Sequence, residues 1–217
     1  MVSIDEYAAA WTSGKVCLHP TDTLPGLSFN PHSPVAEQNF VNLKNRPSDK
    51  SPISLITSWE VATRYWQTLP KTWEEILRDL WPSSLSVIWK ASDTCPKALI
   101  HADGTCGLRM PEWSQETAWM HTLLVRLNSA FPSSSVNLSG QPGANDWASA
   151  LAFLEDKGPD IYIPKLTPRQ IEWHQDRSLA PSTVIRIEDD GTWNVVREGV
   201  LSRFAIKKKW EQHAKRS

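Results

Sequence analysis

The stretch STVIRIE-DDG-TWNVVR, residues 182–197, decides the class of fold. Two runs rich in β-branched residues, 182–188 and 192–197, flank a turn made of Asp189, Asp190 and Gly191. β-Branched residues favour strands, and an Asp-Gly turn between two such runs is typical of a β-hairpin. Because the two strands of a hairpin are antiparallel, the sheet that contains them is not purely parallel.

Five further apolar runs extend this sheet toward the N-terminus. They are short, are bounded by Pro, Gly or Asp, and lie at 15–19, 53–57, 85–91, 106–110 and 133–138. Helical stretches alternate with them at 3–13, 34–44, 59–67, 71–80, 114–130 and 145–157. This alternation predicts an α/β fold with a mixed β-sheet and flanking helices. Residues 158–181 contain four prolines and are expected to form an irregular connector.

The composition indicates one globular domain. The chain has 217 residues, of which 40% are hydrophobic and 22% charged, and a formal net charge of −1. This length can bury one substantial core, and these proportions exclude a wholly disordered chain. The twelve tryptophans follow no fixed period and are expected to serve packing. No apolar run reaches the ~18 residues that a membrane span needs, and the N-terminus lacks a signal pattern, so we expect a cytoplasmic location.

The usual motifs of metal, nucleotide and hydrolase sites are absent from the sequence. Cys17, Cys95 and Cys106 form no CxxC pair, and we expect them to be reduced packing residues. The six histidines show no metal-ligand spacing, so no protein-held metal is predicted. There is no GxxxxGK(S/T), GxGxxG, HExxH or GxSxG. P-loop, dinucleotide-binding, zinc-protease and α/β-hydrolase functions are therefore excluded on motif grounds.

Hydroxyl, amide and cationic residues gather instead at the ends of predicted strands, where α/β proteins bind ligands. Four clusters stand out: Thr21 to Thr23; Lys44, Arg46 and Lys50; Ser133 to Ser139; and Ser182 with Arg197. Cations neutralise a polyphosphate while hydroxyl and amide groups orient it, so converging clusters would predict an anionic ligand. Each cluster alone is weak evidence for a site, because serine-rich turns and helix-end lysines are common.

Several segments resemble, in the same order, the motifs of the YrdC-like threonylcarbamoyl-AMP synthase family. The matching segments are Pro20 to Leu27 (PTDTLPGL, family PT(D/E)TxYGL), Lys44 to Pro52 (KxRPxxxP), Trp81-Pro82 (WPGPxT), Arg109 to Pro111 (RxP), Ser133 to Gly140 (SxANxSG), Pro181 to Val184 (PSTV) and Arg197 to Gly199 (RxG). The matches cover roughly residues 15 to 200. Ordered multiple matches are far more specific than any one of them.

The resemblance implies a twisted mixed sheet with a concave, basic cavity and a definite reaction. Threonine, bicarbonate and ATP would give L-threonylcarbamoyladenylate and pyrophosphate, with Mg²⁺ accompanying ATP. The product would then be passed to a threonylcarbamoyl transferase for N6-threonylcarbamoyladenosine modification of tRNA. By this resemblance the catalytic residues are Lys44, Arg46 and Lys50. The expected threonine-binding residues are Thr21, Thr23 and Arg109, and the expected nucleotide-binding residues are Ser135, Asn137, Ser139, Ser182 and Arg197.

The chain departs from the family pattern at three places. Pro25 stands where the family has a tyrosine, which removes a ring and a hydroxyl from the expected cavity wall. Ser83 and Ser84 replace the Gly-Pro of WPGPxT, although Ser86 keeps a hydroxyl at the position of the threonine. Val136 replaces the alanine of SxAN.

Two other functions remain open at the level of sequence. One is a non-catalytic RNA-binding module with the same fold, since a fold alone does not determine a function. The other is a carbamoyl-adenylate enzyme with a different acceptor. We expect residues 1–203 to form the catalytic domain and residues 204–217 to form a basic, solvated tail, where weak RNA binding is possible.

Overall fold

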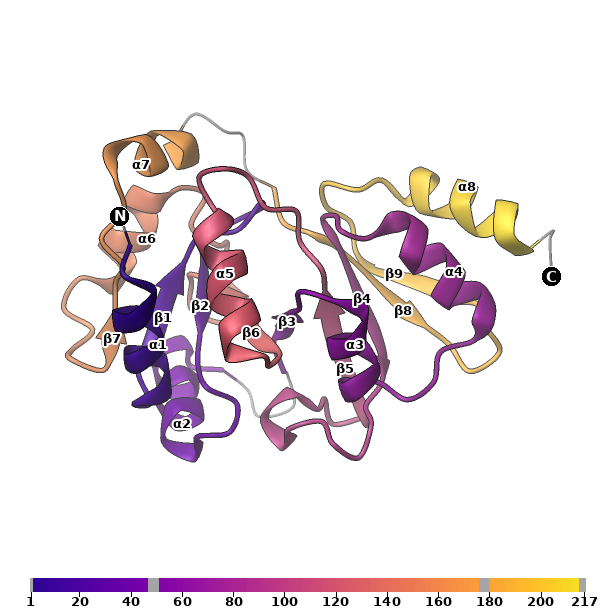
Figure 1. Cartoon of the computed structure of the whole chain (residues 1–217), viewed down its shortest axis with the longest axis horizontal. Helices are drawn as coiled ribbons and strands as arrows, with labels where there is room; N and C mark the ends of the chain where they lie inside the picture. Colours follow the sequence, from indigo (N-terminus) through magenta and orange to yellow (C-terminus); the bar gives the residue numbers. More distant parts are fainter. Residues whose placement is uncertain (1, 47–50, 176–179, 215–217) are drawn as a thin grey trace.

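A computed structural model of the chain describes residues 2–46, 51–175 and 180–214, and its centre is one mixed sheet (Figure 1). Within the described residues the sheet has nine strands. In spatial order they are β7 (Ile161–Tyr162), β1 (Val16–His19), β2 (Gly26–Ser28), β6 (Phe131–Ser135), β3 (Ile53–Leu55), β5 (Thr105–Arg109), β4 (Leu85–Lys90), β8 (Thr183–Ile187) and β9 (Trp193–Arg197). The pairs β1/β7, β3/β5 and β4/β8 are parallel and the others antiparallel. The predicted mixed α/β class is confirmed.

Helices flank the sheet, and several begin where the sequence supplies a capping side chain. They are α1 (Ile4–Thr12), α2 (Pro34–Lys44), α3 (Trp59–Tyr65), α4 (Lys71–Leu80), α5 (Ala118–Leu127), α6 (Trp147–Leu154), α7 (Pro168–Gln175) and α8 (Arg203–Ala214), with a 3-10 helix at Lys97–Leu99. The hydroxyl oxygens of Ser3, Ser33 and Ser58 accept hydrogen bonds from the backbone N–H three residues later. None of the described helices is long and apolar enough to span a bilayer.

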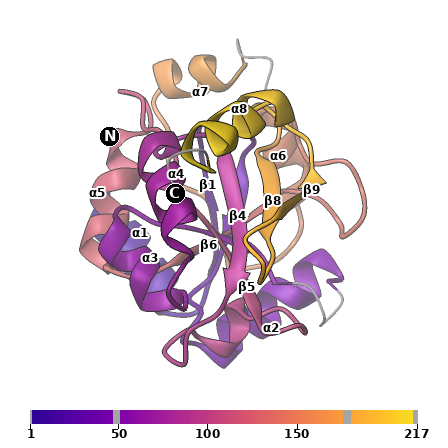
Figure 2. The same cartoon turned by 90° about the vertical axis from the view of Figure 1, so that its right-hand side faces the viewer.

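The two faces of the sheet are covered differently. Figure 2 shows α1, α3, α4 and α5 along one face, with α2 and α6 toward the other. Alternation along the strands explains this division: in β4, Leu85 and Val87 enter the core beneath α3 and α4, whereas Ser86 projects to the opposite face. In β5, Leu108 likewise enters the core, whereas Arg109 lies on the opposite face and lines the cavity. The polar side chains of the central strands therefore share one face.

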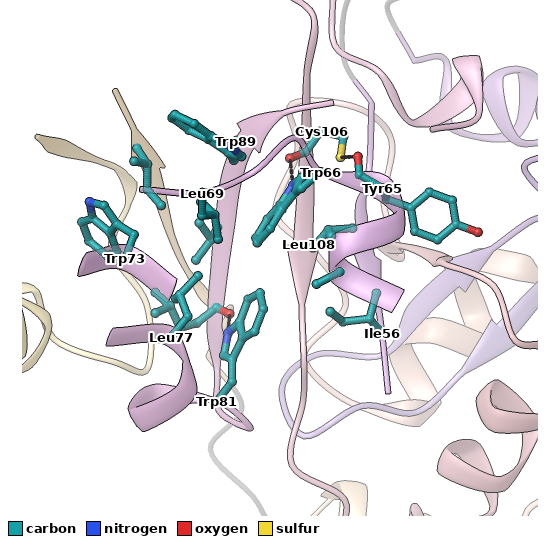
Figure 3. Close-up of a cluster of buried hydrophobic side chains, with 14 of the residues drawn as sticks. Ile56, Tyr65, Trp66, Leu69, Trp73, Leu77, Trp81, Trp89, Cys106 and Leu108 are labelled. Carbon is teal, nitrogen blue, oxygen red and sulfur yellow. Dashed lines mark hydrogen bonds between the residues drawn. The ribbon is translucent and has the colours of Figure 1, made fainter. Parts of the chain in front are cut away.

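Tryptophans fill much of the larger core (Figure 3). The rings of Trp66 and Trp81 stack with their centroids 5.7 Å apart. The Trp66 indole N–H donates to the Cys106 carbonyl over 3.0 Å, and the Trp81 indole N–H donates to the Leu85 carbonyl over 2.8 Å, so each buried ring satisfies its polar atom. The three cysteines are free and buried, which agrees with the packing role expected for them.

The structure also contains elements that the sequence analysis did not predict. The hairpin at 182–197 is confirmed as β8 and β9, but β2 and β7 were missed because they have three and two residues. The connector at 158–181 holds helix α7, whose first residue is Pro168. Proline is compatible with the first turn of a helix, where no intrahelical N–H donor is required. The prolines of this connector are therefore compatible with helix α7, which begins at one of them.

The prediction of a solvated tail at 204–217 is wrong for the residues that the structure describes there. Helix α8 runs to Ala214 and packs against α4. Ile206 is completely buried, and the His213 Nε2 atom lies 3.0 Å from the Asp79 carboxylate. Lys207 and Lys208 are exposed on this helix, whereas the Lys209 Nζ atom lies 3.5 Å from the Asp79 carboxylate of α4, so basic charge did not indicate a solvated tail.

Candidate active site

A cavity of about 350 Å³ opens on the polar face of the sheet and gathers the sequence-predicted site residues. The lining includes Thr21, Thr23, Lys44, Arg46, Arg109, Ser135, Asn137, Ser139, Ser182 and Arg197. Lys50, also predicted, lies outside the described residues. Among the described residues, four cations and no Asp or Glu line the cavity. The expected concave basic cavity is present, and its charge favours anionic ligands.

The β5 end of the cavity is built around Arg109, which is 3% exposed. Its guanidinium forms an ion pair with Asp22 and donates from Nη1 to Thr23 Oγ1 over 2.9 Å. Thr21 Oγ1 accepts from the Thr23 backbone N–H and donates to the Leu24 carbonyl, which folds the loop after β1 into a tight turn. Burial lowers the pKa of Arg109, and the carboxylate of Asp22 opposes this shift.

Lys44, the last residue of α2, forms the opposite end of the cavity. Its side chain is 1% exposed, and its Nζ donates to the Ser135 carbonyl, to the Asn137 carbonyl (2.9 Å) and to Asn137 Oδ1 (3.1 Å). An ammonium has three N–H donors, and here three oxygens accept from them. Burial, together with the nearby charge of Arg46, lowers the pKa of Lys44 to about 7. Lys44 therefore organises the loop after β6.

Arg46 follows α2 after the left-handed residue Asn45, which ends the helix at φ 48°. The Arg46 Nη1 atom donates to Ser134 Oγ over 3.3 Å, and its guanidinium lies 5.9 Å from the centre of the Phe40 ring. The side chain is thus directed across the cavity toward β6, where a planar guanidinium can meet two oxygens of a phosphate.

The loop after β6 is held by its own polar groups. Ser135 Oγ donates to Asn137 Oδ1 over 2.7 Å, and Asn137 Nδ2 donates to the Leu138 and Gln141 carbonyls. The Ser139 backbone N–H donates to the Lys44 carbonyl over 2.8 Å. Asn137 consequently serves the shape of the loop before any ligand binds, and the Ser135 and Ser139 side chains line the space above it.

Ser182 and Arg197 meet at the start of the hairpin. Arg197 donates from Nε and Nη2 to the Ser182 carbonyl at 3.2 and 2.9 Å, and Ser182 Oγ lies 2.9 Å from Ser86 Oγ. A Cβ at Gly199 would lie 2.1 Å from the Pro181 carbonyl oxygen, which explains the glycine two residues after Arg197. Burial and the nearby charge of Arg109 lower the pKa of Arg197.

The sequence analysis gave no role to several residues of this site. Asp22 stood inside a recognised cluster, but only its contact with Arg109 reveals what it does. Ser51 and Gln141 also line the cavity, beside Ser133 and Ser134 of the serine cluster in and after β6. Polar residues are common in turns, so no sequence signal separates Ser51 and Gln141 from ordinary loop residues.

Comparisons with known proteins agree with this geometry. A family model described as "Telomere recombination", which covers the Sua5, YciO and YrdC proteins, matches residues 9–199. A threonylcarbamoyl-AMP synthase of Halorhodospira halophila is 28% identical over 67% of this chain and 72% of its own length. A threonylcarbamoyl-AMP synthase of Pyrococcus abyssi is 30% identical over 59% of this chain and 37% of its own length.

Solved structures show the same fold. The crystal structure of P. abyssi Sua5 complexed with L-threonine superposes with a TM-score of 0.79 and 23% identity, covering 95% of this chain and 56% of that one. E. coli YciO superposes with a TM-score of 0.74 and 22% identity, covering 92% of this chain and 90% of that one. The chain thus spans about half of the Sua5 structure and nearly all of YciO.

Proposed function

Because the chain belongs to the Sua5/YciO/YrdC family, we propose that it synthesises L-threonylcarbamoyladenylate and pyrophosphate from L-threonine, bicarbonate and ATP. Relatives named threonylcarbamoyl-AMP synthase and the threonine complex of Sua5 support this proposal. The observation that carries it is the cavity, whose described lining has four cations, several hydroxyl groups and no carboxylate.

The proposed chemistry needs no covalent bond to the enzyme. The neutral amine of threonine combines with bicarbonate, which loses water, to form a carbamate. A carbamate oxygen then attacks the α-phosphorus of ATP, and the bond to the bridging oxygen breaks as pyrophosphate leaves. Catalysis then consists of positioning and of stabilising the charge on the phosphate oxygens.

We give the cavity residues different tasks in this reaction. Arg46 contacts the phosphates, while Lys44 is a positioning residue whose donors are already used by the loop after β6. Arg109 meets the carboxylate of threonine, with Thr21 and Thr23 shaping the turn beside it. The proposed nucleotide contacts are Ser135, Asn137, Ser139, Ser182 and Arg197. Lys50 keeps its predicted phosphate contact, outside the described residues.

Magnesium enters this proposal with its substrate, as MgATP. No three His, Cys, Asp or Glu side chains within residues 2–46, 51–175 and 180–214 form a group that could hold a metal. Asp22, the carboxylate beside the cavity, already accepts from Arg109 and Ser84. The phosphate oxygens and water are therefore the proposed ligands, in keeping with the usual preference of Mg²⁺. The adenylate would be consumed by a threonylcarbamoyl transferase that modifies adenosine in tRNA.

The test is pyrophosphate release by the purified protein with MgATP, L-threonine and bicarbonate. We expect release that needs all three substrates, with omission of each as the control. Absence of release, together with no thermal shift from ATP plus threonine at millimolar concentration, would exclude the enzyme. RNA binding under those conditions would then favour the non-catalytic alternative.

A further inference from the structure

Arg109 is held by a chain of polar contacts that reaches beyond the residues of the cavity. Its guanidinium pairs with Asp22, whose side chain is 12% exposed. The second carboxylate oxygen of Asp22, Oδ2, accepts a hydrogen bond from Ser84 Oγ over 3.2 Å. Three segments far apart in sequence, the loop after β1, the turn before β4 and the end of β5, thus meet in one line of contacts.

The turn that contributes Ser84 is itself fixed on both sides. The Ser83 backbone N–H donates to the Met110 carbonyl over 2.8 Å, just past the end of β5. The Ser84 carbonyl accepts from the Thr183 backbone N–H over 3.0 Å, at the start of β8. Because the backbone is anchored to two strands, the Ser84 hydroxyl has a defined position from which to orient Asp22.

A buried ion pair needs such a third contact. A carboxylate that accepts from a guanidinium through one oxygen can still rotate about its side-chain bonds, and the guanidinium follows it. A hydrogen bond to the other oxygen removes this freedom and satisfies another acceptor. Ser84 stands where the family pattern has proline, so this hydrogen bond depends on a departure from that pattern.

We propose that Asp22 and Ser84 are positioning residues, which fix the direction in which Arg109 presents its remaining N–H groups to the carboxylate of threonine. This inference rests on the proposed function. Since Asp22 neutralises Arg109, the pair attracts a carboxylate mainly through directed hydrogen bonds. A small rotation of the guanidinium therefore weakens threonine binding and leaves the steps at the α-phosphate unchanged.

The neighbouring Ser83 provides a matched control. Its hydroxyl is buried but has no hydrogen-bond partner in the part of the chain that the structure describes, whereas the Ser84 hydroxyl has Asp22. We expect Ser84→Ala to raise KM for threonine about three- to tenfold, the usual net effect of losing one hydrogen bond. The turnover number and KM for ATP should stay within about twofold of wild type in this comparison. Ser84→Thr, which keeps the hydroxyl, should restore KM, and Ser83→Ala should leave it unchanged.

A second measurement does not depend on activity. The Arg109 Nε–H, buried and identified by the loss of its ¹⁵N–¹H signal in Arg109→Lys, should exchange slowly with solvent in wild type and in Ser83→Ala. Ser84→Ala should shift this signal and speed its exchange. Equal KM values and equal exchange in Ser83→Ala and Ser84→Ala would overturn the inference. If wild type releases no pyrophosphate, the proposed function fails, and the exchange measurement alone decides whether Ser84 positions Arg109.

Discussion

A buried cation lies at each end of the cavity, and the two cations are stabilised by different kinds of partner. At the β5 end, Arg109 is 3% exposed and has the carboxylate of Asp22 against it. At the α2 end, Lys44 is 1% exposed and donates, within the described part of the chain, to uncharged oxygens of Ser135 and Asn137. Burial lowers the pKa of both side chains, but among residues 2–46, 51–175 and 180–214 an opposing charge is present only beside the arginine.

This difference gives the two ends different electrostatic characters. At the β5 end, the Arg109–Asp22 pair is close to neutral and would recognise a small ligand by the direction of its hydrogen bonds. The α2 end keeps the charge of Arg46 beside Lys44, and a positive field of this kind attracts phosphate groups from a distance. The proposed division between threonine at one end and phosphates at the other follows from this contrast.

The largest expected effect comes from removing the compensating carboxylate. Asp22→Ala leaves Arg109 buried and unpaired, so the free energy of unfolding should fall by about 3–5 kcal/mol. Lys44→Met is the comparison, because it removes a buried charge and takes the Lys44 donor from the Ser135 and Asn137 carbonyls, at a cost of about 1–3 kcal/mol, while Asn137 Oδ1 keeps its bond from Ser135 Oγ. Denaturant titration measures both. A larger decrease in the free energy of unfolding in Lys44→Met than in Asp22→Ala would contradict the proposed difference between the two ends.

Arg46 tests whether the α2 end acts on the phosphates. Arg46→Ala should raise the barrier for pyrophosphate release by about 2–4 kcal/mol while the melting temperature changes little. Arg46→Lys keeps the charge but lacks the planar guanidinium with its paired donors, so it should lose less activity than Arg46→Ala. If Arg46→Ala melts several degrees lower and releases pyrophosphate at the wild-type rate, the residue serves the end of α2, and the phosphates bind elsewhere.

The ionisation of Lys44 gives a smaller, pH-dependent effect. Its pKa is lowered to about 7 in the folded protein, from 10.5 for an ordinary lysine. Between these values the unfolded chain binds more protons, so this residue's contribution to the free energy of unfolding increases as the pH rises above about 7. The difference in unfolding free energy between wild type and Lys44→Met should therefore increase from pH 7 to 9. A constant difference would mean that the three acceptor oxygens keep the ammonium charged despite its burial.

Pro25 should give the smallest effect, at the end where threonine is proposed to bind. It is buried, lines the cavity and stands where the family has tyrosine. Pro25→Tyr adds a ring and a hydroxyl to the wall, so the preference for threonine over serine, as a ratio of kcat/KM values, should rise by roughly two- to fivefold. An unchanged or lower ratio, in a variant that melts like wild type, would make this departure purely structural.

Features that depend on neighbouring residues were readable from the sequence. Ser3, Ser33 and Ser58 cap their helices through bonds to the third following residue, and the Asp-Asp-Gly turn closes the hairpin with Gly191 at φ 80°. Each of the seven predicted strands overlaps a strand of the sheet, although the run 133–138 shares only residues 133–135 with β6, because a short β-branched or apolar run bounded by turn residues is a local signal. Short β2 and β7 carry too few residues for such a signal and exist through pairing with β1.

The sequence by itself determined the α/β class, the hairpin and the residue types of the cavity, and the family resemblance indicated which polar residues would converge. Only the tertiary structure decided what these residues do to one another. Lys44 meets Ser135 across 91 residues of chain, Asp22 meets Arg109 across 87, and Ser84 meets Asp22 across 62. Contacts over such separations depend on how strands are ordered in the sheet and on which face each side chain occupies. Periodicity and capping patterns describe only a few successive residues, so they contain no information about these partners.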